Sequence, residues 1–64
     1  MEEKVIVLIF DGKKKIKENE FWNYDKAWKY AHDQVSFHGF TAKIQRLVDG
    51  KPWAVTTILP KEIF

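Results

Sequence analysis

Hydrophobic positions follow two different periods along this chain. Residues 5–10 form a continuous, short and β-branched apolar run that ends at an Asp-Gly pair, which favours a strand buried on both faces over a helix. After residue 23 the period lengthens, and the apolar positions fall within an arc of about 100° on a helix. The residues of this arc are Tyr24, Ala27, Trp28, Ala31, Val35 and His38. The pattern therefore predicts strands around one amphipathic helix.

Local signals predict that the helix covers residues 24–38. Asn23 is placed to cap its N-terminus, and Asp25 lies in the first turn, where the helix dipole favours an anion. Gly39 follows the last apolar position and supplies a left-handed C-terminal stop.

Two Asp-Gly pairs, Asp11-Gly12 and Asp49-Gly50, predict two hairpins with two-residue loops of type I′. The strands predicted on either side of them cover residues 5–10, 13–19, 41–48 and 53–59. The expected fold is thus a single small α+β domain over residues 1–64, in the order ββαββ. We expect a four-stranded, mostly antiparallel sheet with the helix packed on one face.

This order of elements resembles the β-grasp arrangement of the small immunoglobulin-binding domains of protein G and protein L. The resemblance implies the strand order 2-1-4-3, in which the first and last strands are neighbours. It lies in topology alone, because no binding residue of those domains has a counterpart by motif in this chain. It therefore implies no site and no antibody binding.

The register of the two loops assigns side chains to faces of the sheet. A loop at Asp11-Gly12 would place Val7 opposite Ile16, and the second loop would bring Trp53 opposite Arg46, which permits a cation–π contact. The core predicted from this register and from the helix is Val5, Val7, Ile9, Ile16, Trp28, Ala31, Val35, Ile44, Val55 and Leu59.

One helix covers only one face, so apolar side chains of the first strand remain on the other face. These are Ile6, Leu8 and Phe10, with Ile58 beside them. Three explanations stay open: lysine stems and residues 60–64 fold over this face, a protein partner or a second copy binds there, or the face contacts single-stranded nucleic acid. On the helix, the aromatics away from the core stripe could be additional partner anchors or could fold back at its rim. They are Tyr30 and Phe37.

The nucleic-acid alternative depends on a basic cluster. Alternation places Lys13, Lys15 and Lys17 on one face, where Lys43 can join them and neutralise phosphates. The competing explanation is that these lysines protect an edge strand from aggregation. The net charge of +2 is too small to indicate nucleic-acid binding without such local clustering.

Catalytic and metal-binding patterns are not expected in this chain. His32 and His38 are six positions apart, about 120° around a helix, so they cannot converge on a zinc ion, and the chain has no cysteine. We expect no enzymatic activity, cofactor or metal. The longest apolar run is six residues, far below the ~20 that span a bilayer, so we expect a soluble protein. The absence of cysteine permits a reducing compartment, and the cytoplasm is the default expectation.

The sequence predicts a small non-enzymatic protein-interaction module that binds a partner or a second copy through the uncovered sheet face. The alternative is weak binding of single-stranded nucleic acid by the lysine-rimmed face.

Overall fold

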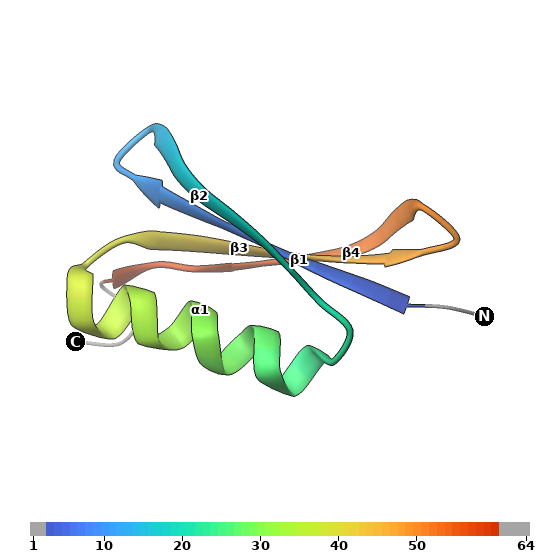
Figure 1. Cartoon of the computed structure of the whole chain (residues 1–64). Coiled ribbons are helices and arrows are strands. Elements are labelled where there is room, and N and C mark those ends of the chain that lie inside the picture. The colour runs from blue at the N-terminus through green and yellow to red at the C-terminus, as the bar shows by residue number, and fades with distance from the viewer. Residues whose placement is uncertain (1–2, 61–64) are drawn as a thin grey trace.

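The computed structural model describes residues 3–60, which form one sheet and one helix (Figure 1). The elements are β1 (Glu3–Asp11), β2 (Lys14–Phe21), α1 (Tyr24–His38), β3 (Thr41–Val48) and β4 (Lys51–Ile58). The helix lies along one face of the strongly twisted sheet, and no other described element covers the opposite face. The predicted α+β class and the order ββαββ are confirmed.

Both predicted ends of α1 are confirmed by their capping contacts. Asn23 Oδ1 accepts hydrogen bonds from the backbone N–H of Asp25 at 2.8 Å and of Lys26 at 3.4 Å. Gly39 has a φ of 69°, and its N–H donates to the carbonyl of Val35 at 3.0 Å. The left-handed conformation suits glycine, which has no Cβ to clash with the backbone.

The strand order is β2-β1-β3-β4, and every neighbouring pair is antiparallel. The order 2-1-4-3 implied by the β-grasp resemblance is therefore wrong. Burial explains why β3 is the inner strand, since it contributes the buried Ala42 and Ile44 whereas β4 contributes only Ile58. The pairing of β1 with β3 is also antiparallel, which is slightly more stable per residue than the parallel pairing in a β-grasp sheet.

The first hairpin turns one residue later than predicted. Asp11 pairs with Lys14, so the two-residue loop is Gly12-Lys13. Gly12 has a φ of 66° and is the only residue of this loop with a positive φ. That pattern is typical of a type II′ loop, which requires glycine only at its first central position and leaves Asp11 extended.

A bulge in β2 then shifts the register again. The residue left out of the pairing is Ile16, which lies at the bulge opposite Ile9 and Phe10. Val7 faces Asn19 rather than Ile16, and Ile16 is 38% exposed instead of belonging to the core. The predicted register of this hairpin was wrong because an alternating pattern gives no sign of an inserted residue.

The second hairpin has the predicted loop. Val48 pairs with Lys51, and Asp49 and Gly50 have φ angles of 54° and 80°, as a type I′ loop requires.

Beyond this loop, a bulge leaves Trp53 out of the pairing of β4 with β3. Because side chains alternate along a strand, one extra residue moves every later residue of β4 to the other face. Ile58, predicted on the uncovered face, pairs with Ala42 and is only 8% exposed. Val55, predicted in the core, is 55% exposed.

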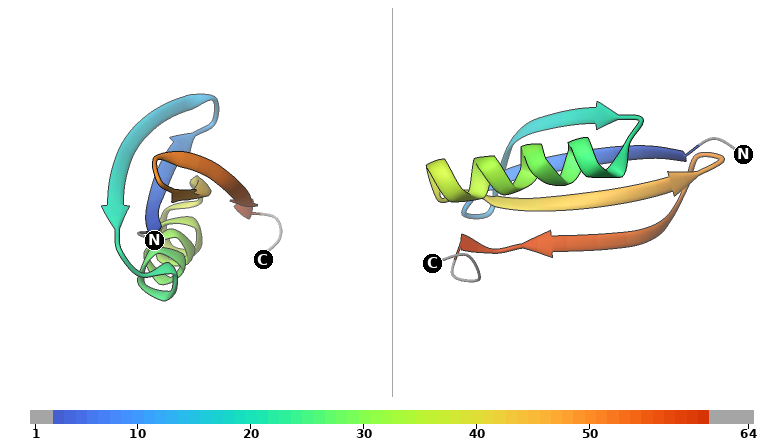
Figure 2. Two further views of the ribbon diagram at one scale, coloured as in Figure 1. Left: turned by 90° about the vertical axis from the view of Figure 1, so that its right-hand side faces the viewer. Right: turned by 90° about the horizontal axis from the view of Figure 1, so that it is seen from below.

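The core lies between α1 and the middle of the sheet (Figure 2). Its buried side chains are Val5, Val7, Ile9, Ala27, Ala31, Val35, Ala42, Ile44 and Ile58. Four predicted members are absent from it: Ile16, Trp28, Val55 and Leu59. Bulges account for Ile16, Val55 and Leu59, and Trp28 lies at the margin of the helix stripe, whose centre is filled by alanines.

The bulge in β4 can be tested by placing threonine at two positions. Ile58→Thr should lower the free energy of unfolding by about 2 kcal/mol or more, because it introduces a buried hydroxyl and removes apolar contacts. Val55→Thr should change it by less than about 0.5 kcal/mol, because the site is exposed and threonine keeps the β-branched shape. Urea titrations at low protein concentration measure both values. If β4 had the predicted register without the bulge, Val55→Thr would lower the free energy of unfolding more than Ile58→Thr.

Candidate interaction surface

The sheet face opposite α1, here called the outer face, carries an apolar stripe along the central strand β1. Its members are Ile6, Leu8 and Phe10, which alternate with the fully buried residues of the same strand. Each is half-buried, although no described element packs on this face. Their neighbours in the pairing are Glu18, Glu20 and Lys15 from β2 and Thr41, Lys43 and Gln45 from β3. The stripe is therefore flanked on both sides by polar side chains.

Some of these polar side chains lean over the stripe. Lys43 Nζ lies 5.5 Å from the centroid of the Phe10 ring. Lys15 Nζ lies 3.0 Å from Glu18 Oε1, and both side chains remain about half exposed. Long stems can cover apolar carbon while their charged ends stay in water. This partial cover agrees with the explanation that lysine stems fold over the outer face. Residues 61–64, which the same explanation places over this face, lie outside the described part of the chain.

One end of the outer face is hollowed. The hollow measures about 530 Å³ and is lined by Lys4, Ile6, Trp22, Leu47, Asp49 and Gly50. Trp22 forms a wall that is 70% exposed, and Lys4 Nζ lies 5.5 Å from its ring centroid and 3.7 Å from Glu20 Oε2. Sequence reasoning did not find this hollow, because Trp22 follows β2 and its position depends on the shifted register of the first hairpin.

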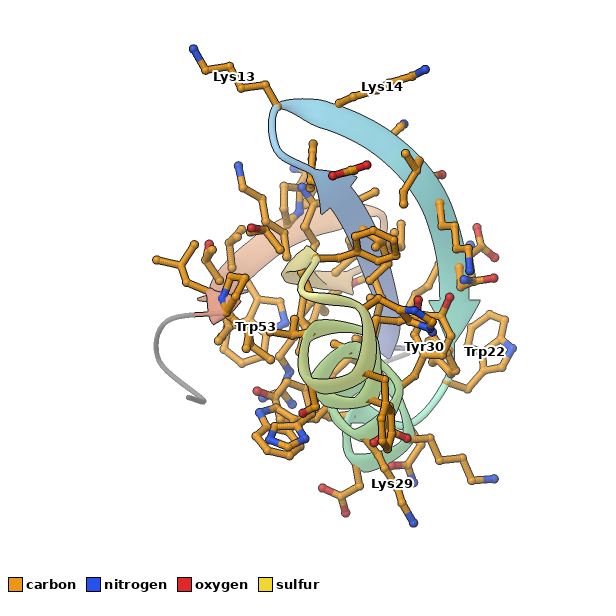
Figure 3. All side chains as sticks on the ribbon, turned by 90° about the vertical axis from the view of Figure 1, so that its left-hand side faces the viewer. Lys13, Lys14, Trp22, Lys29, Tyr30 and Trp53 are labelled. Carbon is orange, nitrogen blue, oxygen red and sulfur yellow. The ribbon has the colours of Figure 1, made fainter. Side chains whose placement is uncertain are left out.

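The two predicted helix anchors have different surroundings. Tyr30 is half-buried, its hydroxyl accepts a hydrogen bond from Asn19 Nδ2 at 2.7 Å, and its ring centroid lies 5.4 Å from that of Phe21. Figure 3 shows it between α1 and β2. Phe37 is 79% exposed. Neither side chain lies on the outer face, so the structure does not bring them together with the stripe.

The predicted basic cluster is divided between the two faces. Lys15 and Lys43 lie on the outer face, whereas Lys17 pairs with Ile9 and therefore lies on the side of the helix. Lys13 lies in the loop and projects away from the sheet (Figure 3). The bulge in β2 causes this separation, because it reverses the alternation between positions 15 and 17.

Arg46 forms the densest set of polar contacts on the helix side of the sheet. Its Nη2 lies 2.8 Å and 3.1 Å from the two carboxylate oxygens of Glu3. Its guanidinium carbon lies 4.5 Å from the ring centroid of Tyr24 and 4.7 Å from that of Trp53. The predicted contact of Trp53 with Arg46 is confirmed, and the cluster ties β1, β3, β4 and the first turn of α1 together.

Residues 3–60 contain no group of three or more His, Cys, Asp or Glu side chains that could hold a metal ion. Within the same residues no helix has the length and apolar character needed to cross a membrane. His32 instead stacks on Trp28, with 4.8 Å between ring centroids, and its carbonyl accepts a hydrogen bond from Ser36 Oγ at 2.8 Å.

Comparisons of the chain with protein-family models, with curated proteins and with solved structures each gave no match. A function must therefore be argued from the surfaces of the chain itself.

The Arg46 cluster should stabilise the fold. Arg46→Lys keeps the charge but loses the bidentate geometry and the planar stacking, so the free energy of unfolding should fall by about 1–2 kcal/mol. Glu3→Gln keeps the rings stacked on the guanidinium, so it should lower the free energy of unfolding less than Arg46→Lys does. Thermal and urea unfolding measure the two changes, and equal losses would show that the aromatic contacts contribute nothing.

Proposed function

We propose that this chain is a non-enzymatic protein-interaction module that binds a partner protein through its outer sheet face. The observation that carries the proposal is the apolar stripe of Ile6, Leu8 and Phe10 on a face that no described element covers. Antiparallel sheets with one solvated face normally alternate apolar and polar residues, so a central strand that is apolar on both faces needs a second packing partner.

The composition of the outer face supports a protein partner. Its centre is apolar and half-buried, and its margin carries charges of both signs from Lys15, Glu18 and Lys43. An apolar centre with a polar margin is the usual anatomy of protein interfaces. The hollow beside Trp22 adds a recess in which a partner's side chain could be seated, and aromatic residues contribute strongly to such anchor sites.

Nucleic-acid binding has weaker support from the same residues. Lys17 lies on the other face, and Glu18 and Glu20 add negative charge beside the stripe. A face that neutralises phosphates would lose affinity steeply as salt rises, whereas an apolar face would not. The salt dependence of binding therefore separates the two functions.

Photo-cross-linking in a lysate of the source cells tests the proposal. A benzophenone amino acid at position 45 replaces Gln45, which neighbours Ile6 on the outer face. The control places it at position 29, where Lys29 points away from the sheet (Figure 3). We expect protein adducts from position 45 that are absent from position 29 and that persist at high salt.

A second variant decides whether the stripe itself makes the contact. Leu8→Glu should reduce the position-45 adducts at least about tenfold, because a charge in the centre of an apolar interface costs more than 1.4 kcal/mol. Circular dichroism checks that the variant folds, and Leu8→Thr replaces it if it does not. Adducts that survive either folded variant would contradict the proposal, and adducts that contain nucleic acid and vanish at high salt would favour the alternative.

A further inference from the structure

The two edges of the described sheet differ sharply in charge. The edge strand β2 carries Lys14, Lys15, Lys17, Glu18 and Glu20. The other edge strand, β4, has Lys51 at its start and no charged residue from Pro52 to Ile58. Charged edge strands resist pairing with other chains, while uncharged β-branched edges favour it. Of the two edges, β4 is the one able to accept a further strand.

The part of β4 that can pair is short and well delimited. Trp53 lies at a bulge, which interrupts the regular ladder, and Pro60 has no N–H to donate. Between them, residues 54–58 pair regularly with β3. In an antiparallel ladder alternate residues direct their N–H and C=O groups away from the neighbouring strand, so half of the backbone groups in this segment face outward.

Exposed apolar side chains surround this segment on both faces of the sheet. Val55, on the outer face, is 55% exposed, and Trp53, on the helix side, is 56% exposed. Trp28 is 41% exposed. It precedes Tyr30 by two positions, and two positions correspond to about 200° of rotation around a helix. Since Tyr30 contacts β2, Trp28 lies on nearly the opposite side of α1. It therefore faces the β4 side. Figure 2 shows α1 over β1 and β3, with most of β4 to the side of the helix, although Ile58 near its end is buried.

We propose that β4 pairs antiparallel with β4 of a second copy of this chain, with Thr56 facing Thr56 across a two-fold axis. Residues 54–58 are centred on Thr56, so this register uses the whole regular segment. It places Val55 opposite Thr57 and Ala54 opposite Ile58. Facing residues lie on the same face of the sheet, so both helices would cover the same side of a continuous eight-stranded sheet.

A second copy suits this edge because the segment is complementary to itself. Residues 54–58 carry no charge, so no like charges meet within the paired segment, and Thr–Thr and Thr–Val pairs are favourable across antiparallel strands. A pairing of two five-residue segments is a small interface compared with the ~1,200 Å² or more that stable complexes bury, so we expect the dimer to dissociate on dilution.

Sedimentation measured over a range of protein concentrations tests the dimer. The unmodified chain should shift from monomer to dimer as its concentration rises towards about 1 mM, as expected for a weak complex. Val55→Lys should raise the dissociation constant at least about tenfold, because it places charges at the interface. Ile16→Lys, the matched control on the β2 edge, should leave the dissociation constant unchanged. A chain that stays monomeric throughout, or a dimer weakened only by Ile16→Lys, overturns the proposal.

Cysteine cross-linking tests the register, and the absence of cysteine from the chain leaves a single thiol in each variant. Thr56→Cys should form an intermolecular disulfide readily, because facing Cβ atoms lie about 4.5–5.5 Å apart. Ala54→Cys, on the same face, should cross-link poorly, because two such residues would lie roughly 13 Å apart along the strands. Equal rates at the two positions, or faster cross-linking at position 54, would overturn the proposed register.

Leu8→Glu separates this inference from the proposed function. Dimerisation through β4 leaves the stripe on β1 untouched, so Leu8→Glu should keep the dissociation constant of the dimer while it removes the outer-face adducts. A dimer that Leu8→Glu abolishes and Val55→Lys does not would assign self-association to the outer face and overturn the β4 proposal.

Discussion

Packing of α1 on the central pair β1 and β3 is the interaction on which the rest of the structure depends. Alternate β1 residues from Val5 to Ile9 are fully buried under the helix, together with Ile44 of β3. The helix presents Ala27 and Ala31 to them, and these small side chains let the helix backbone approach the sheet closely. In a chain this small, this one layer of contacts supplies most of the apolar burial that stabilises the described fold.

This packing also decides which surfaces stay available. A helix lying over β1 and β3 covers the two edge strands only in part, and no described element forms a second layer on the outer face (Figures 1 and 2). The stripe from Ile6 to Phe10 then lies on the same strand as the core, only one pleat away from it. Changes to the stripe therefore act close to the core, which is why each test of binding needs a folded variant.

Two bulges distribute the remaining side chains. The bulge at Trp53 moves Ile58 into the core and Val55 out of it, while the Trp53 ring packs on Arg46. The bulge at Ile16 separates Lys15 from Lys17 and removes the continuous basic face. Bulges commonly twist and interrupt edge strands. The two edges also differ in charge, because β2 carries several charged residues whereas β4 carries none from Pro52 to Ile58.

The sequence by itself determined the elements of this protein. The ends of α1 at Asn23 and Gly39, the Asp49-Gly50 loop, and the division of β1 into a buried and an outer face all follow from local backbone preferences and side-chain alternation. These features depend on residues close together in the chain, so a single sequence is enough to predict them.

Only the tertiary structure decided the strand order, the two bulges and the face on which each later residue lies. An inserted residue such as Trp53 or Ile16 cannot be recognised from the neighbouring residues in the sequence. The free energy of a bulge depends on which side chains the shifted strand then buries. The shift lets Ile58 fill the core beside Ala42, whereas the regular register would bury Val55 instead. The candidate surface was thus predictable on β1, where alternation holds, and not on β2 and β4, where packing against distant residues fixes the register.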